Sequence, residues 1–404
     1  MDFTFSPDDQ QLIDRARELA AEFATRAREY DEAASFPEKD FEQLRQAGLL
    51  SLTVPRDLGG HGMWQGDRYL PFYTMLETIA VGAASTAQLL QITSHASGIV
   101  AYLGNDEQRR RILGDVVENG ALIASCGSEA DPRAVSSGKV ESGLRPVQGG
   151  FRISGVKHFG SLAPAADYYL LYVLAPGTNT IAEGYTTVIV PKGSEGVWFE
   201  DNWDTMGMRA TISWALHLDD VFIPWENVIG RPGDWVQHDP RTFTLAYVAN
   251  HLGTAQGAFN FVRDYLKERT YLMSDNVVAF TFGELDSALQ ATRTSMWYAA
   301  WLWEQGRFEE AEMASMRALH TSKQSALMVV TKAFDICGAR AAFKHLPLER
   351  AFRDVRTFSL HFRESQLLHM LAEADLGGAF HSKQKYGPKV GRQSWEAIGV
   401  EVPS

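Results

Sequence analysis

The sequence predicts an α+β fold in three successive zones: helices, then short strands, then helices again. Apolar residues recur at helical spacing up to about residue 120 and again from about 242 to 377. Between about 121 and 229 the chain instead forms short β-rich runs bounded by proline and glycine. Because helices and strands are segregated along the chain, the α+β class is favoured. The expected domains are residues 1–120, 121–232 and 233–380, followed by a tail over 381–404.

The composition is that of a large globular protein. The 404 residues are 45% hydrophobic, which is ample for a sizeable core. The net charge of -12, from 38 Lys plus Arg and 50 Asp plus Glu, argues against broad binding to nucleic acid. Cys126 and Cys337 are too few for a disulfide framework or a zinc cluster, so no metal site is expected. We find no signal peptide and no apolar run near the roughly 18 residues of a membrane span, and therefore expect a cytoplasmic protein without a membrane partner.

The first zone opens with a strong helix-start signal. Ser6 offers a hydroxyl N-cap, Pro7 suits the first helical position, and acids follow in the first turn. Apolar residues then recur at helical spacing, namely Leu12, Ala16, Leu19 and Phe23. The segment 54–60 marks a loop, and apolar helices return over about 69–103.

The second zone changes to the period of a strand, and the third returns to long helices. Residues 168–174 and 186–190 are rich in β-branched, aromatic and other apolar side chains, as strands are. Farther on, Gly306 and Gly338 are expected to separate helices. The tail after Gly377 is basic with little periodicity, and it could be mobile or wrap a neighbouring subunit.

Six local motifs, in order between residues 5 and 376, resemble those of the acyl-CoA dehydrogenases. They are LSLTVPRDLGG at 50–60, CGSE at 126–129, GVKHFGS at 155–161, MGMRAT at 206–211, KER at 267–269 and RD at 353–354. One such motif is weak evidence, whereas six in order are strong. The resemblance implies an N-terminal helical domain, a middle β-barrel-like domain and a C-terminal four-helix bundle. It also implies a flavin cofactor held across a dimer interface, within a homotetramer built as a dimer of dimers.

The resemblance also implies which side chains contact the flavin ring, since such a ring needs hydrogen-bond partners and a wall for its face. Cys126 and Ser128 lie in the turn that contacts the flavin, Ser161 lies near the flavin N5, and Phe159 lies against the ring. The alternative is that these are loop serines and a core aromatic residue.

At the phosphate end, the resemblance implies that Arg269 reaches the flavin phosphate of a neighbouring subunit, since the guanidinium fork suits phosphate. A plain charge at a helix C-terminus is the alternative. The turn with Gly338, Ala339 and Arg340 aligns with a phosphate-binding turn of the family. Asp335 replaces the usual Gln there and would repel a pyrophosphate, so reduced FMN fits as well as FAD.

The carboxylate base of the dehydrogenases is missing from both of its usual places. Dehydrogenation removes a proton next to a thioester and needs this base. Phe362 stands at one family position and Phe243 at the other. Glu364, two residues beyond Phe362, could be a shifted base.

The segments 201–207 (DNWDTMG) and 353–361 (RDVRTFSLH) resemble instead the flavin-dependent monooxygenases of this fold, such as dibenzothiophene monooxygenase and the amino-sugar N-oxygenases. That resemblance implies His361, His95 and Ser161 as catalytic residues, because a histidine of near-neutral pKa can give or take protons. Each histidine could also be an ordinary surface or core residue. Cys126 departs from the Asn that this class often has near its turn.

Three functions stay open. The first is a monooxygenase that takes reduced flavin from a separate reductase, reacts it with O2 to a flavin hydroperoxide, and oxygenates N, S or C of a small organic substrate. A Gly-x-Gly-x-x-Gly fingerprint is missing, which fits an external reductase. The alternatives are a dehydrogenase or oxidase of acyl-CoA or acyl-carrier thioesters with a relocated base, and a catalytically silent subunit of a hetero-oligomer. Phe243, Tyr247 and Phe362 predict a partly aromatic substrate pocket.

Overall fold

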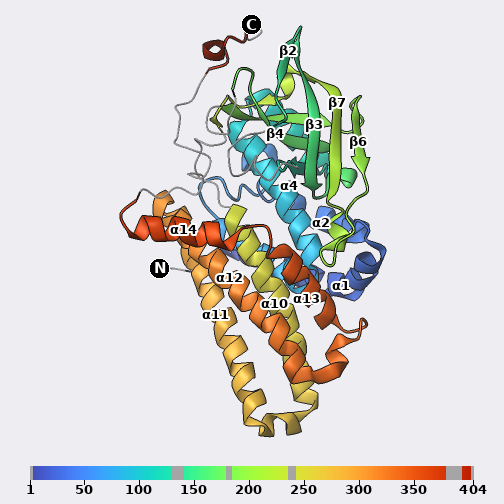
Figure 1. Cartoon of the computed structure of the whole chain (residues 1–404), viewed down its shortest axis with the longest axis vertical. Coiled ribbons are helices and arrows are strands. Elements are labelled where there is room, and N and C mark those ends of the chain that lie inside the picture. The colour runs from blue at the N-terminus through green and yellow to red at the C-terminus, as the bar shows by residue number, and fades with distance from the viewer. Residues whose placement is uncertain (1–2, 130–140, 179–183, 235–242, 379–393, 402–404) are drawn as a thin grey trace.

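The computed structural model describes residues 3–129, 141–178, 184–234, 243–378 and 394–401. Two small sheets lie at one end of the molecule and a bundle of long helices at the other, with N-terminal helices between them (Figure 1). The predicted α+β class with helical, β and helical parts in order is confirmed.

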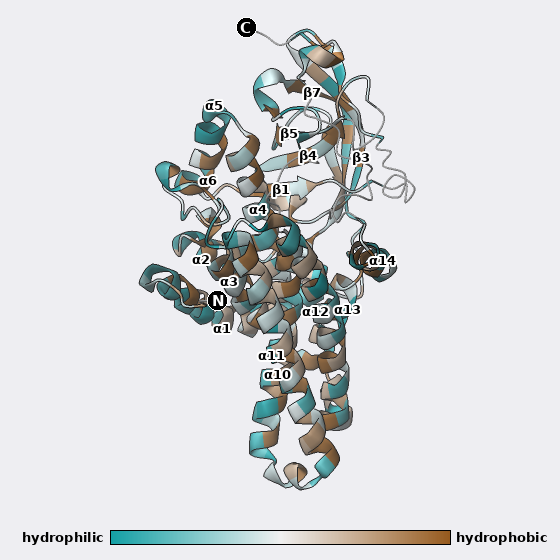
Figure 2. Ribbon diagram, turned by 90° about the vertical axis from the view of Figure 1, so that its left-hand side faces the viewer, coloured by the Kyte–Doolittle hydropathy of each residue, from teal (hydrophilic) through white to brown (hydrophobic). Residues whose placement is uncertain are grey.

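The N-terminal part is helical, as predicted. Its helices are α1 (Pro7–Ala33), α2 (Glu38–Gln46), α3 (Tyr69–Gly82), α4 (Ala84–Leu103), α5 (Asp106–Gln108) and α6 (Gly114–Asn119). Ser6 caps α1 by accepting a hydrogen bond from the Asp9 amide at 3.1 Å. The buried face of α1 runs from Ile13 to Ala27, while its outer face is hydrophilic (Figure 2).

The middle part consists of two four-stranded sheets. Their strands are β1 (Ile123–Cys126), β2 (Arg145–Val147), β3 (Gly150–Gly160), β4 (Tyr168–Leu174), β5 (Tyr185–Pro191), β6 (Val197–Glu200), β7 (Trp214–Pro224) and β8 (Val228–Ile229). One sheet has the order β1-β4-β5-β8 and the other β2-β3-β7-β6. Strands β1 and β4 pair parallel, whereas the other pairs are antiparallel. Both sheets bury apolar side chains in one continuous core, which is what holds them face to face.

The C-terminal part is a bundle. Its helices are α10 (Phe243–Glu268), α11 (Asn276–Glu304), α12 (Phe308–Cys337), α13 (Pro347–Phe358) and α14 (Glu364–Asp375). Gly306 and Gly338 both have φ of 68° and separate helices, as predicted. Helix α10 also packs closely on α3, because a Cβ at Gly253 would collide with the Glu77 carbonyl. The middle of α10 therefore lies beside the N-terminal helix α3.

The structure describes the tail only over residues 394–401, so the basic stretch that starts after Gly377 lies outside the described residues. Trp395 is buried there, with its ring 5.6 Å from Phe151 and 5.5 Å from Trp225. This part of the tail packs on the sheets of its own chain. Among the described residues, we find no helix that is both long and apolar enough to cross a membrane.

Candidate active site

Segments from all three parts of the chain meet in one small apolar cluster. Its buried members are Ala84 of α4, Met208 of the 201–213 loop and Phe358 of α13, and Trp203 and Tyr247 pack against them. Because the three parts contribute side chains to this cluster, it marks a junction rather than the core of one domain. Ligand sites often lie at such junctions.

Two loops at this junction hold strained backbone. Phe159, Leu162, Met208 and Ile212 have φ of 56°, 74°, 55° and 40°. These four are half of the eight non-glycine residues with positive φ in the described chain. The left-handed conformation costs roughly 1–2 kcal/mol per residue and tends to persist at functional sites. The Leu162 amide donates to the Thr211 carbonyl at 3.1 Å, so the loops support each other.

Phe159 offers an exposed aromatic face beside these loops. Its side chain is 64% exposed, and its ring lies 6.1 Å from that of Trp203 in an edge-on arrangement. Trp203 is fixed in turn, because its Nε1 donates to the Met208 carbonyl at 3.0 Å. A large apolar side chain held open to solvent on strained backbone fits the predicted wall for a flavin ring.

Ser161 lies two residues farther on and belongs to a buried chain of hydroxyls. Its Oγ is 2.7 Å from Ser213 Oγ, which is 2.7 Å from Thr211 Oγ1. Thr211 Oγ1 donates to the Met208 carbonyl at 2.8 Å. The motif predicted Ser161, but the partner Ser213 was missed, since only the folded loops bring the two together.

The turn after β1 lies against β3, and the groups that it could present to a ligand are mainly backbone atoms. Ser128 is exposed, and its carbonyl accepts from the His158 amide at 2.8 Å. The Cys126 thiol is buried, and burial raises its pKa to about 12, so it is not a nucleophile. A flavin contact from Cys126 would therefore come from its main chain.

A buried ion pair fixes this turn. Lys157 Nζ lies 2.6 Å from Glu129 Oε1, with both side chains nearly inaccessible, and it also donates to the Tyr172 carbonyl at 2.6 Å. Burial alone would raise the pKa of Glu129, but the Lys157 ammonium and hydrogen bonds from the Glu141 and Ser142 amides hold it below its usual range. The motif residues Glu129 and Lys157 thus position the backbone leading to Phe159 and Ser161.

His361 lies in the turn between α13 and α14. Its Nδ1 is 2.9 Å from the Phe358 carbonyl, which can only accept, so Nδ1 carries the hydrogen and Nε2 keeps a lone pair. The ring centroid is 4.7 Å from that of Phe358 and 5.0 Å from that of Tyr247. The residue is exposed to solvent, although the Phe358 and Tyr247 rings pack against its imidazole and partly desolvate it. This desolvation lowers its pKa although the Phe358 hydrogen bond raises it, so the neutral form prevails at neutral pH.

The predicted aromatic side chains lie beside His361. Tyr247 and Phe362 meet edge-on at 5.2 Å. Lys323 of α12 donates to the Phe362 carbonyl at 3.1 Å and so anchors the turn. Phe243 begins α10, but its side chain lies outside the described residues.

His251 is a further neighbour of this group, and none of the sequence motifs contains it. It is buried one turn after Tyr247, with its ring 5.1 Å from Phe358 and its Nδ1 3.2 Å from Ser322 Oγ. Burial, with smaller contributions from His361 and Lys323, lowers its pKa to about 3. Its helical spacing from Tyr247 was the one available sequence signal.

Glu364, the candidate shifted base, is engaged elsewhere. Its Oε1 lies 2.7 Å from both Gln324 Nε2 and His320 Nδ1 of α12. Burial would raise its pKa, but Gln324, Lys323 and His320 lower it overall. A carboxylate held in this way is a poor general base at neutral pH.

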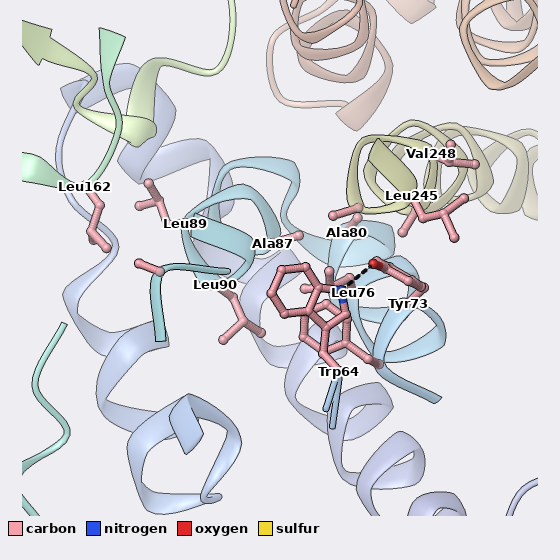
Figure 3. Close-up of a cluster of buried hydrophobic side chains, with 14 of the residues drawn as sticks. Trp64, Tyr73, Leu76, Ala80, Ala87, Leu89, Leu90, Leu162, Leu245 and Val248 are labelled. Carbon is pink, nitrogen blue, oxygen red and sulfur yellow. Dashed lines mark hydrogen bonds between the residues drawn. The ribbon is translucent and has the colours of Figure 1, made fainter. Parts of the chain in front are cut away.

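His95 belongs to a different aromatic group from His361. Its ring lies edge-on to Trp64 at 5.4 Å, and Trp64 Nε1 donates to the Tyr73 hydroxyl at 3.0 Å. Figure 3 shows this Trp64–Tyr73 pair against α3 and α4. His95 follows Ala84 by three helical turns on the same face of α4, which places it roughly 16 Å farther along the axis.

The predicted phosphate residues gather at the far end of the bundle. The Arg269 guanidinium lies 4.0 Å from the Tyr265 ring centroid, and the Tyr265 hydroxyl donates to the Cys337 carbonyl at 3.3 Å. Gly338, Ala339 and Arg340 follow in an exposed turn. Burial raises the pKa of Cys337 to about 11 although Arg269 opposes this, which places the guanidinium near the turn. The structure therefore brings Arg269 and the 338–340 turn together.

This group lies far from the junction. Arg269 follows Tyr247 by 22 residues along α10, a rise of roughly 33 Å. Within the described ranges, no cluster of three or more His, Cys, Asp or Glu side chains is arranged to hold a metal ion.

Comparisons with known proteins agree with this architecture. The N-terminal, middle and C-terminal domain models of acyl-CoA dehydrogenase match residues 6–119, 128–221 and 245–366. The chain is 27% identical to dibenzothiophene monooxygenase from Mycolicibacterium goodii, over 86% of this chain and 89% of that protein. It is 30% identical to YdbM of Bacillus subtilis (strain 168), assigned by name to the acyl-CoA dehydrogenases, over 92% and 98%. The fold matches FMN-bound TdsC from Paenibacillus sp. A11-2 with a TM-score of 0.84, at 22% identity over 93% of this chain and all of that one.

Proposed function

Because this chain belongs to the acyl-CoA dehydrogenase family of flavin oxidoreductases, we propose that it is a flavin-dependent monooxygenase that oxygenates a small organic substrate at N, S or C. In this proposal a separate reductase supplies reduced flavin, and oxygen transfer proceeds through a flavin hydroperoxide. The bound flavin supplies the activation of dioxygen, and the residues of the chain bind, orient and exchange protons.

The observation that carries the proposal is the replacement of a carboxylate by a neutral imidazole at the junction. Phe362 stands at the position of the missing base, and Glu364 is bonded to α12. His361 instead presents an Nε2 lone pair, since Nδ1 donates to Phe358. Such a group can accept or return a proton at a substrate heteroatom, but it is a weaker match to proton abstraction from a thioester.

We assign the remaining roles from position. Phe159 and Trp203 form the wall for the ring, Ser161 meets the ring edge at N5, and the main chain of 126–128 lies beside them. Tyr247 and Phe362 line the substrate side next to His361. His95 stays a candidate for a proton-transfer role from α4.

The far end of the bundle is proposed to hold the flavin phosphate of a second copy of the chain, within a dimer of dimers. The roughly 33 Å between Tyr247 and Arg269 along α10 supports this arrangement. The same end exposes large apolar side chains, which are Tyr271, Met273, Val277, Phe280 and Phe343. Hydrophobic residues are visible on the ribbons there (Figure 2). Asp335 is exposed beside the turn, so both FMN and FAD remain candidates.

The test is stopped-flow mixing of the protein, loaded with reduced FMN or FAD, with oxygenated buffer. A transient flavin hydroperoxide absorbance is expected, and its yield identifies the preferred flavin. Direct reoxidation without an intermediate, together with anaerobic bleaching of oxidised flavin by an acyl thioester, would contradict the monooxygenase and support a dehydrogenase. Absence of flavin turnover until another protein is added would instead indicate a silent subunit.

A further inference from the structure

We propose that Thr211 and Ser213 set the hydrogen-bonding polarity of Ser161, so that the site favours a flavin carrying a proton on N5 over the oxidised form. The inference rests on the proposed function in one respect, which is that Ser161 faces the flavin N5. Thr211 and Ser213 act here as positioning residues, through the hydroxyl of Ser161.

The polarity follows from counting hydrogens along the chain of hydroxyls. The Met208 carbonyl can only accept, so Thr211 donates its hydroxyl hydrogen to it at 2.8 Å. Thr211 Oγ1 must then accept from Ser213 at 2.7 Å, and Ser213 must accept from Ser161 at 2.7 Å. Ser161 has no hydroxyl hydrogen left, and it presents only a lone pair toward a ligand.

Burial keeps this arrangement in place. Thr211 and Ser213 are only 2% and 3% exposed, so water cannot replace a lost partner. Reversing the direction of these hydrogen bonds would make Ser161 a donor. Thr211 would then have to stop donating to the Met208 carbonyl. That carbonyl is also held by Trp203 Nε1 at 3.0 Å and by the Thr211 amide at 3.1 Å, which fixes the anchor. The reversal therefore costs about one hydrogen bond.

The two redox states of a flavin differ in what N5 needs. Reduced flavin has an N5 hydrogen and needs an acceptor, whereas oxidised flavin has an N5 lone pair and needs a donor. A Ser161 that only accepts therefore suits the reduced form. For an enzyme that receives reduced flavin from another protein, this bias favours capture of the reduced form and release of the oxidised product.

The experiment measures the affinities of the full chain for reduced FMN, titrated anaerobically, and for oxidised FMN. The wild type is expected to bind reduced FMN more tightly. Ser213→Ala frees the Ser161 hydroxyl to donate, so the ratio of the two affinities should fall roughly fivefold. For a two-electron couple, this equals a drop of about 20 mV in the potential of the bound flavin.

Thr211→Val removes the anchor and should lower the ratio in the same direction, which keeps the test open if Ser213→Ala does not fold. Thr187→Val is the matched control, because Thr187 Oγ1 is a buried hydroxyl that donates to the Ile229 carbonyl at 2.7 Å in the other sheet of the middle part. An unchanged ratio in Ser213→Ala and Thr211→Val would overturn the inference and leave the proposed function standing. A wild type that binds neither form of FMN nor FAD would overturn the proposed function itself.

Discussion

The two ends of α10 differ in how firmly the surrounding residues are held. At the junction, strained loops, a buried ion pair and a chain of hydroxyls fix Phe159, Ser161 and their neighbours within a single chain. At the far end, Arg269 and the 338–340 turn are solvent-accessible, and a Cβ at Gly338 would meet nothing within 4 Å. The difference suggests that chemistry is organised within one chain, whereas phosphate binding is completed by another molecule.

The largest effect is expected at His361. In His361→Ala the flavin should still bind, while product formation falls roughly 100- to 10,000-fold because proton transfer at the substrate is lost. Reduced flavin should then release hydrogen peroxide, which a peroxidase-coupled assay detects together with oxygen uptake. His369→Ala is the control, since His369 is exposed on α14 and 72% of its side chain is accessible. Unchanged coupling of oxygen uptake to product in His361→Ala would remove the assigned role.

The next largest effect is expected at the buried ion pair between Lys157 and Glu129, which supports the junction. Lys157→Met leaves the buried Glu129 carboxylate without its counter-ion, which should lower the free energy of unfolding by about 3–5 kcal/mol. Urea denaturation measures this change, and adding Glu129→Gln should restore part of the loss. The exposed pair between Arg145 and Asp220, also at 2.6 Å, gives the control. Arg145→Ala should cost about 1 kcal/mol or less, and an equal loss in both variants would contradict the special role of the buried pair.

A pH dependence should report how the 206–211 loop is tied to α13. Asp354 accepts from the Met208 amide at 2.6 Å, and burial raises its pKa to about 6. Because the folded state holds this proton after the unfolded state has lost it, stability should fall as pH rises from about 4 to 6 and change little above. The loss is on the order of 2–3 kcal/mol. The free energy of unfolding of Asp354→Asn, measured by denaturation across this pH range, should lack this decrease. The same pH dependence in Asp354→Asn and the wild type would refute the assignment.

The smallest effect is expected at the far end. Arg269→Ala should weaken flavin binding by roughly 10-fold, because one charge-assisted contact to a phosphate is lost, while the wall and the edge contacts remain. Flavin titration at several protein concentrations measures this loss and its link to dimer formation. Arg263→Ala, an exposed guanidinium on the same helix bonded to Asp264 at 3.3 Å, should leave affinity unchanged. Equal affinities in all three proteins would argue against a phosphate role for this end.

The sequence predicted the fold class, the order of the three parts and the family. Those features depend on local signals: helical and strand periodicity, the Ser6 cap, the breakers Gly306 and Gly338, and motifs that are contiguous in the chain. The motifs also pointed to Ser161 and His361, whose roles stay predictions. Local patterns sufficed here because helix and strand formation involves residues near in sequence.

Only the tertiary structure decided which side chains face one another. It paired Ser161 with Ser213 and Lys157 with Glu129, turned Glu364 toward α12, and set His95 against Trp64. It also brought the ordinary-looking His251 next to Phe358. Each of these contacts joins segments that are separated along the chain. Hydrogen-bond polarity and pKa depend on such contacts, and no local pattern in the sequence encodes them.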